Sequence, residues 1–211
     1  MTTSVPPGTN MHQQRAGVIV INWGLAYIFA LFAVAHLRLF LQQPRLSLVL
    51  IVAVESLLVV FLLIRRDADY TWHSWRTWLP TIGGTFFPLL LRPIEAVADI
   101  PAGQALQISG AILQIAALLS LNRSMGLLPA NRGLQSNGMY RLVRHPLYLA
   151  YTIALVGYLI SNWSAYNAAV ILVGTCFQIV RIRNEERLLL SYPEFSTFVA
   201  RTRWRMIPYV W

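Results

Sequence analysis

Long apolar runs alternate with shorter polar links along most of the chain. The apolar runs cover residues 16–40, 46–64, 104–121, 146–160 and 164–180. An α-helix rises about 1.5 Å per residue and the hydrocarbon core of a bilayer is about 30 Å thick, so runs of this kind can cross a membrane as helices. The pattern predicts an all-α, polytopic bundle of membrane-spanning helices.

Residues 81–98 decide whether the bundle has five or six spans. Residues 81–91 are strongly apolar but short, and a polar Arg92-Pro93-Ile94-Glu95 stretch follows them. The segment is either a span that continues to about residue 98 or a re-entrant piece. Six spans fit the charges better, because they place Arg65 and Arg66 on the same side as the other arginine-rich links.

Three tryptophans are spaced three residues apart just before this segment. Trp72, Trp75 and Trp78 fall within residues 65–80, where charged side chains are mixed among them. This pattern predicts an interfacial helix that lies at the level of the lipid headgroups. The alternative is that these side chains line a pocket.

The two ends of the chain differ in pattern. Residues 1–15 are mostly polar and contain Pro and Gly, so we expect a disordered tail. After the last apolar run, apolar residues recur at steps of four, three and four, which predicts an amphipathic helical tail that folds back under the bundle. Pro193 should break this tail and open a second short helix. The recurring residues are Leu188, Tyr192, Phe195 and Val199.

Composition narrows the class of protein. The chain is 56% hydrophobic and only 12% charged, and its mean hydropathy is +0.54, which is unlike a water-soluble domain. All 17 basic residues are arginine, so enzymes that need a Schiff-base or P-loop lysine are excluded. The lone Cys176 allows no internal disulfide, and we expect it to be a small buried apolar residue.

The arginines also predict the orientation. The link at 122–145 and the last 31 residues hold ten of the 17 arginines, and the hairpin between them puts both on one side. Arginine-rich links of membrane proteins face the cytoplasm, so we expect a multi-pass membrane protein with this side and the C-terminus cytoplasmic. The net charge of +9 then reflects contact with membrane lipids, and we expect no nucleic-acid partner.

Two short stretches carry candidate chemistry. Pro146 suits the first turn of a helix and His145 its cap, which places Arg144 and His145 at the membrane surface beside unpaired backbone N–H groups. Such a helix start favours an anionic or acceptor-rich ligand, and Tyr148 lies one turn further on the same face as Arg144. The alternative is an ordinary boundary of a span, where arginine and tyrosine are common.

The second stretch is Arg181-Ile182-Arg183-Asn184-Glu185-Glu186-Arg187. Arg181 and Glu185 share a helix face, whereas Glu186 points elsewhere. They are either a surface ion pair where a span ends or part of a site, since the hairpin brings this end beside Arg144 and His145.

These motifs resemble a known family. The sequence GMYRLVRHPLYLAY at 138–151, followed by R-x-x-x-E-E-x-x-L at 181–189, is similar to the RHPxY and EE signature of the isoprenylcysteine carboxyl methyltransferases, much of which the phospholipid N-methyltransferases share. The tail agrees in part, because the tyrosines of the family's Y-x-x-Y-x-x-R are here phenylalanines. Residues 121–126 and 129–133 resemble the bacterial branch. The resemblance covers about 118–211, which we interpret as a methyltransferase core after N-terminal spans at 16–117. The tail positions are Phe195, Phe198, Arg201 and Pro208.

The resemblance implies a site for S-adenosyl-L-methionine without a Rossmann fold. It implies that Arg181 faces the methyl acceptor, that Glu185 binds polar groups of the cofactor, and that both are catalytic. With Arg144 from the helix-start argument, the remaining cofactor residues are Arg132, Gly133, Leu134, Gln135, Tyr140, His145, Pro146, Leu147 and Tyr148. No metal is expected.

The expected activity is methyl transfer from S-adenosyl-L-methionine to a lipophilic acceptor that enters from the bilayer, most like carboxyl O-methylation of an isoprenylcysteine. One alternative is a phospholipid N-methyltransferase. Another is a non-catalytic membrane protein or transporter, since Glu55 lies near the middle of the 46–64 span, where an ionisable residue suggests function. His36 or Arg92 could pair with Glu55, and a purely structural hydrogen bond is equally open.

Overall fold

A computed structural model describes residues 11–67, 74–94 and 100–211, with side chains from residue 19 onward. All regular structure in these ranges is helical, as the apolar pattern predicts. The α-helices are α1 (Met11–Gln42), α2 (Leu46–Ile64), α3 (Trp75–Phe86), α4 (Pro101–Leu121), α5 (Pro146–Ser161), α6 (Ala165–Leu189) and α7 (Pro193–Arg201), and the 3₁₀ turns are η1 (Phe87–Leu90), η2 (Asn122–Ser124) and η3 (Gly138–Arg141).

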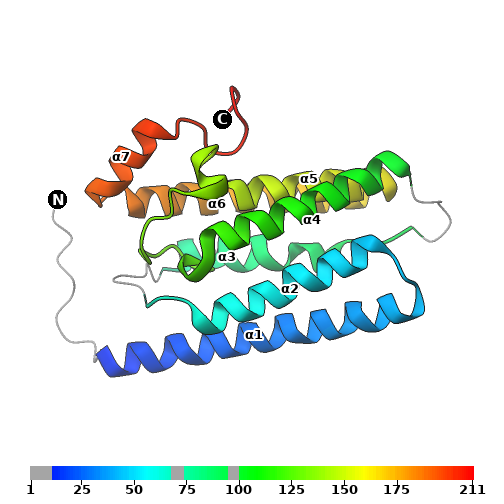
Figure 1. Cartoon of the computed structure of the whole chain (residues 1–211), viewed down its shortest axis with the longest axis horizontal. Coiled ribbons are helices and arrows are strands. Elements are labelled where there is room, and N and C mark those ends of the chain that lie inside the picture. Colours follow the sequence, from blue (N-terminus) through cyan, green and yellow to red (C-terminus); the bar gives the residue numbers. More distant parts are fainter. Residues whose placement is uncertain (1–10, 68–73, 95–99) are drawn as a thin grey trace.

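Among the described residues, four helical segments are long and apolar enough to cross a membrane: Ile19–Gln42, Leu46–Ile64, Pro101–Ser124 and Ala165–Leu189. The 16-residue α5 is apolar but shorter. These helices lie roughly along one direction in Figure 1, and large apolar side chains cover their outer surfaces. Such a surface suits lipid and not water. The chain is therefore an all-α membrane bundle.

The segment from Trp75 to Ile94 runs the length of α6. At one end, the Asn184 side chain donates a hydrogen bond to the Arg76 carbonyl. At the other, the Arg92 N–H donates to the Asn167 side-chain oxygen over 3.0 Å. The helix predicted within residues 81–98 thus begins earlier, at Trp75, and ends at Phe86. The chain then continues through η1 and an extended stretch to Ile94.

Prolines explain why this segment is only partly helical. Pro88 and Pro93 have no N–H to donate, so they do not continue an α-helix. Exposed backbone groups are costly inside a membrane, and here side chains satisfy them. The Asn167 amide donates to the Arg92 carbonyl over 2.9 Å, and the Asn162 side-chain oxygen accepts from the Ile94 N–H over 3.0 Å. The segment therefore runs beside α6 as a helix followed by an extended stretch, which we call the broken pass.

The prediction of an interfacial helix over residues 65–80 is wrong in its bounds. Ser74 caps α3 in a reciprocal capping box with Thr77, so the helix begins at Trp75, and residues 65–67 are not helical. Trp75 is 70% exposed, whereas Trp78 is half-buried and lines a cavity described below. Trp72 lies outside the described residues. Because α3 packs on α6, it belongs to the bundle.

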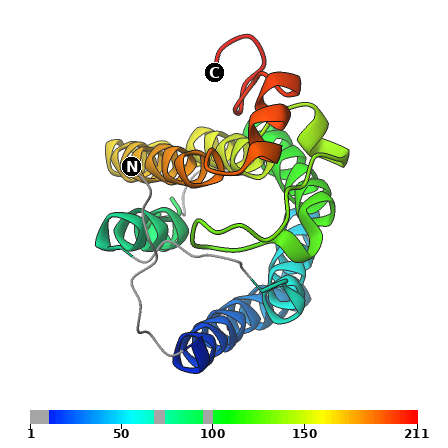
Figure 2. The same cartoon turned by 90° about the vertical axis from the view of Figure 1, so that its left-hand side faces the viewer.

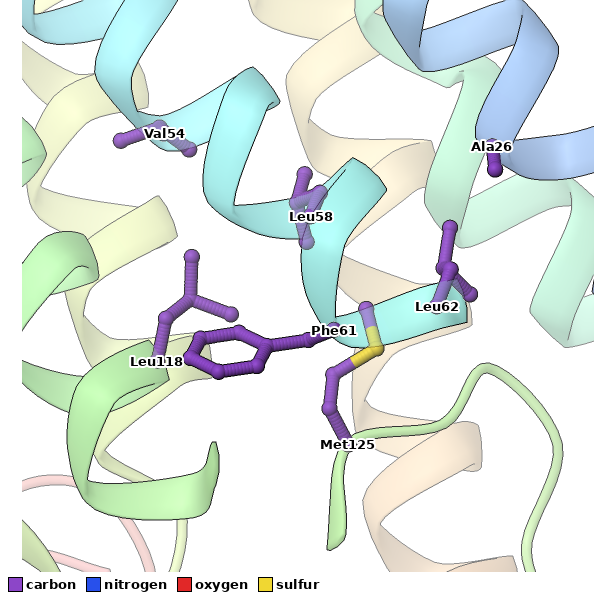
Figure 3. Close-up of a cluster of buried hydrophobic side chains, with 7 residues drawn as sticks. All are labelled: Ala26, Val54, Leu58, Phe61, Leu62, Leu118 and Met125. Atoms are coloured by element: carbon purple, nitrogen blue, oxygen red, sulfur yellow. The ribbon is translucent and has the colours of Figure 1, made fainter. Parts of the chain in front are cut away.

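Two kinds of contact hold the bundle together. Between α1, α2 and the end of α4, large side chains form a buried cluster around Leu58, Leu62 and Leu118 (Figure 3). Between α4 and α5 the backbones approach closely, since a Cβ on Gly110 would meet Ala154 at 2.7 Å. Small residues allow such contacts between membrane helices. The residues of the cluster are Ala26, Val54, Leu58, Phe61, Leu62, Leu118 and Met125.

The arginine-rich links gather at one end of the bundle. The Arg66 N–H donates to the Arg123 carbonyl over 2.8 Å, and the Arg123 side chain returns a bond to the Ile64 carbonyl, which ties the end of α2 to the end of α4. Viewed onto this end, the chain after η2 crosses from α4 toward α3 and returns (Figure 2). The starts of α5 and α7 also lie here (Figure 1).

Two further expectations need correction. Helix α1 already includes residues 11–15 of the expected tail, and residues 1–10 lie outside the described part. Cys176 is exposed on the surface of α6, not buried, because the outer faces of membrane helices are themselves apolar.

Candidate functional site

A cavity of about 60 Å³ lies at the arginine-rich end, between the link at 124–135, η3, and the ends of α6 and α7. We call it the polar cup. It brings together eight of the residues that the sequence predicts for the cofactor. These eight are Arg132, Gly133, Leu134, Gln135, Tyr140, Arg144, His145 and Glu185.

Three parts of the chain position these residues: the start of α5, the end of α6, and η3 with α7. Pro146 opens α5 with His145 as its N-cap, which fixes Arg144 and His145 at the rim. Helix α6 continues past the apolar run to Leu189 and carries Glu185 to the same rim. The floor is aromatic, formed by Tyr140 with two residues of α7. The α7 residues are Phe195 and Phe198.

The loop at residues 124–135 forms the remaining wall of the polar cup, and we call it the loop wall. Gly133 has φ +86°, a conformation that favours glycine, so the chain can turn here without strain. The Ser124 hydroxyl donates to the Arg132 carbonyl over 3.1 Å, and the Gln135 amide donates to the Ser124 hydroxyl over 3.0 Å. Only these few hydrogen bonds hold this wall to η2 among the described contacts.

Four predicted residues do not line the polar cup. Pro146 is fully buried, and Leu147 packs against the cluster of Figure 3. The ring of Tyr148 makes an edge contact with His145 at 5.7 Å between centroids, and the Arg181 guanidinium lies 5.4 Å from the centre of the Tyr148 ring. Tyr148 thus links the rim to Arg181.

Arg181 points toward α3 and not toward Glu185. Its guanidinium donates to the Thr85 hydroxyl over 3.3 Å and to the Leu127 carbonyl over 3.2 Å. No ion pair joins Arg181 to Glu185 in the part of the chain that the structure describes. The surface ion pair considered from the sequence is therefore not formed.

Glu185 is the carboxylate of the polar cup, and its charge acts on two cup residues. Burial, and then the neighbouring Arg65 cation, lower the pKa of Arg132 to about 10, an effect that Glu185 partly offsets. Burial and Glu185 together raise the pKa of the Tyr140 phenol well above its usual value. Arg132 therefore remains a cation and Tyr140 a neutral hydroxyl at physiological pH.

Glu186, which the sequence placed away from the site, is the centre of a buried charge cluster. One carboxylate oxygen accepts from Arg144 Nη1 at 2.7 Å and lies 3.3 Å from His145 Nε2. The other accepts from Arg205 Nε at 2.8 Å. The side chains of Glu186 and Arg144 are only 6% and 9% exposed. We call Glu186, Arg144, His145 and Arg205 the Glu186 cluster.

The chain after α7 completes this cluster. The backbone N–H of Arg144 donates to the Trp204 carbonyl over 2.9 Å, that of His145 donates to the Arg205 carbonyl over 2.8 Å, and Arg144 Nη2 donates to the Arg203 carbonyl over 2.8 Å. The two terminal nitrogens of Arg144 thus donate to Glu186 and to the Arg203 carbonyl, whereas its buried Nε has no hydrogen-bond partner among the described residues. No local pattern in residues 202–211 could have predicted these partners.

A second cavity of about 250 Å³ lies between α1, α3 and residues 127–132. Its walls are almost entirely carbon, so we call it the apolar cavity. Arg132 lines both cavities and separates them. Trp78 lines the apolar cavity, as the alternative interpretation of the tryptophans allowed.

Glu55 lines neither cavity. His36 Nδ1 is 3.0 Å from Glu55 Oε2, so the partner of Glu55 is His36 of α1. Arg92 instead lies 4.4 Å from the ring centre of Tyr166, beside Asn167. The pair joins α1 to α2, which is the structural alternative considered from the sequence.

Comparison with known proteins identifies a similarity in the part of the chain that forms the polar cup. No curated protein matches the sequence significantly. Residues 99–192 match the model of a family described as phospholipid methyltransferase. The matched segment includes α4, the loop wall, α5 and α6, and so most of the polar cup and Glu186. Over this segment, which is less than half of the chain, the protein is similar to the phospholipid methyltransferases.

Proposed function

We propose that the protein transfers a methyl group from S-adenosyl-L-methionine to a lipophilic acceptor, and that the polar cup holds this cofactor at the cytoplasmic face. One observation carries the proposal: the loop wall, the start of α5 and the end of α6 place their predicted residues around one polar cavity. Fourteen of the 17 arginines belong to this end, which supports its cytoplasmic orientation. The other three are Arg38, Arg45 and Arg92.

The donor set suits such a cofactor. Glu185 offers a carboxylate to ammonium or ribose hydroxyl groups, Gln135 and Asn131 offer amides, and the aromatic floor offers a surface for a purine. When bound, S-adenosyl-L-methionine supplies a methyl group that its sulfonium already activates. The cavity of about 60 Å³ is well below the roughly 300 Å³ of a typical small-molecule site, so the loop wall has to move outward on binding.

The charges favour an acceptor that needs no base. Glu186 already accepts from two arginines and contacts His145, so neither Glu186 nor His145 is free to remove a proton. A carboxylate is already a nucleophile and needs only to be held in position. This supports carboxyl O-methylation of an isoprenylcysteine-like acceptor, with Arg181 positioned beside it through Thr85 and Leu127.

The family description favours a second candidate, N-methylation of a phospholipid headgroup. An amine acceptor would have to lose a proton, and Glu185 is the carboxylate of the polar cup that could take it. The product distinguishes the two reactions. Incubation of the purified protein in lipid with methyl-labelled cofactor gives a base-labile methyl ester in the first case and a base-stable N-methyl lipid in the second.

Calorimetric titration of the purified protein with S-adenosyl-L-methionine tests the cup itself. We expect Glu185→Gln to lower the affinity at least tenfold, because the charge that faces the cofactor is lost. The matched control is Glu194→Gln, an exposed glutamate of α7 that does not line the cup, which should bind like the wild type. Equal affinity of all three proteins, or no binding by the wild type, would overturn the proposal.

A further inference from the structure

We propose that the chain after α7 is a membrane-surface anchor, which binds anionic lipid headgroups in the leaflet at the arginine-rich end. We call residues 203–211 the aromatic loop. The inference goes beyond the proposed function, because it concerns a contact with the bilayer and not the methyl transfer. Three features carry it: where the loop lies, which side chains it exposes, and how the charges around it are paired.

The aromatic loop lies beside the start of α5. The Arg144 N–H donates to the Trp204 carbonyl over 2.9 Å. The next N–H, that of His145, donates to the Arg205 carbonyl over 2.8 Å, so the loop runs along the residues that precede α5. In both views, α7 and the chain after it project from the side of the bundle opposite α1 (Figure 1 and Figure 2). A segment that projects sideways where an apolar helix begins meets the lipid headgroups.

The aromatic loop exposes large apolar side chains. Tyr209 is 87% exposed and Val210 is 74% exposed, and Ile207 is exposed as well. Water is an unfavourable environment for neighbouring apolar side chains, whereas the boundary between headgroups and acyl chains accommodates them. Tyrosine and tryptophan are common at this depth, because their rings are apolar and their polar groups stay in contact with water.

The backbone of the loop satisfies its own hydrogen bonds, which suits a segment at the edge of the hydrocarbon. The Trp211 carbonyl accepts from the N–H groups of residues 205–207 over 3.0, 3.0 and 3.1 Å. The Ile207 carbonyl accepts from the N–H groups of Val210 and Trp211 over 3.1 and 3.0 Å. Few backbone groups therefore lose a water partner when the loop contacts lipid, and its exposed side chains are held in place.

Two exposed arginines at this surface provide the charge for an anionic headgroup. Neither Arg201 nor Arg203 forms an ion pair in the part of the chain that the structure describes. The Arg203 guanidinium lies over the Trp204 ring, 5.2 Å from its centre, which leaves the N–H edge of the guanidinium for phosphate oxygens. Exposed arginines beside aromatic and aliphatic side chains favour a leaflet that contains anionic lipids.

The acidic residues of this region do not balance these arginines. Glu186 already accepts from two other arginines, and Glu185 lines the polar cup. Glu194 lies at the start of α7, seven residues before Arg201 and so about 10 Å from it along the helix. Residues 187–211 contain four arginines and one acid, so the surface around the loop carries a net positive charge.

Fluorescence quenching in nanodiscs tests the anchor with the full chain. Cys176 is the only cysteine, so Val210→Cys in a Cys176→Ser background accepts a single fluorophore at an exposed position of the loop. The quencher is phosphatidylcholine with a nitroxide on its headgroup. It is present at the same fraction in bilayers of phosphatidylcholine alone and in bilayers that also contain phosphatidylglycerol. We expect quenching to be at least twofold stronger with phosphatidylglycerol, and high salt should remove the difference.

Charge variants of the labelled protein identify the groups that bind the headgroups. The double variant Arg201→Gln and Arg203→Gln should lose most of the effect of phosphatidylglycerol. The matched control is Arg183→Gln with Arg187→Gln, which removes the same charge from exposed arginines of α6 and should keep the effect. Melting temperatures show whether each labelled variant is folded.

Three results would overturn the inference. The absence of quenching in both bilayers would show that the aromatic loop faces water or a soluble partner. Equal quenching in both bilayers would show that the loop does not select anionic lipids. An effect of phosphatidylglycerol that survives in the double variant, or is lost equally in the control, would show that Arg201 and Arg203 do not bind the headgroups.

Discussion

Glu185 and Glu186 are neighbours in the sequence, and we predict that neutralising them has opposite consequences. Glu186 is buried and contacts Arg144, His145 and Arg205. Glu185 is half-buried and lines the polar cup. Glu186→Gln should therefore destabilise the fold, whereas Glu185→Gln should weaken ligand binding and leave the fold almost as stable.

The magnitude follows from what Glu186→Gln leaves behind. The substitution keeps the shape of the side chain but removes the negative charge that balances Arg144, which is 9% exposed. Breaking a buried ion pair by removing one partner costs about 3–5 kcal/mol. At about 2–4 °C per kcal/mol for a chain of this size, the melting temperature should fall by about 6–20 °C. Arg205 is 36% exposed, so Arg205→Gln should cost no more than about 1 kcal/mol.

The assay is thermal unfolding of the purified variants in one detergent, followed by calorimetric titration with S-adenosyl-L-methionine well below every melting temperature. Glu185→Gln should melt within about 2 °C of the wild type and bind at least tenfold more weakly. A Glu186→Gln variant that melts like the wild type would refute the role of the Glu186 cluster. A Glu185→Gln variant that is as unstable as Glu186→Gln would refute the assignment of ligand binding to Glu185 and of fold stability to Glu186.

Three further variants test other parts of the structure. Gly133→Ala puts a Cβ at φ +86° and close to an Arg66 nitrogen, so it should strain the loop wall by about 1–2 kcal/mol and weaken cofactor binding. The control is Gly24→Ala, because Gly24 has open space around it. Equal cofactor binding by the two variants would contradict the role of the loop wall in binding. Asn167→Leu removes the hydrogen bonds that hold the extended stretch after α3. It should lower the free energy of unfolding by about 2–3 kcal/mol, measured by detergent-to-SDS denaturation. An unchanged free energy of unfolding would contradict this role of Asn167. Glu55→Leu removes the contact between His36 of α1 and Glu55 of α2. It should lower the free energy of unfolding by about 1 kcal/mol in the same assay, without loss of methyl transfer. A stable but inactive variant would show that Glu55 has a functional role.

The sequence alone predicted those features that depend on neighbouring residues. Hydrophobic runs identified the membrane helices, because their length and composition match the bilayer without any partner. Pro146 and Pro193 marked the starts of α5 and α7, since proline fits the first turn of a helix and little else in one. The motifs at 138–151 and 181–189 also indicated that residues on both legs of the α5–α6 hairpin would meet.

The tertiary structure decided which partner each charged group took. Arg144 and Glu186 are 42 residues apart, and Arg205 comes from a tail without a local signal, so only packing shows that they share one buried cluster. The broken pass through Ile94 likewise depends on Asn162 and Asn167, which satisfy its backbone from the opposite hairpin turn. Local sequence sets the period and the ends of a helix. The rotation of one helix against another determines whether Glu185 or Glu186 lines the polar cup, and that rotation results from contacts spread over the whole bundle.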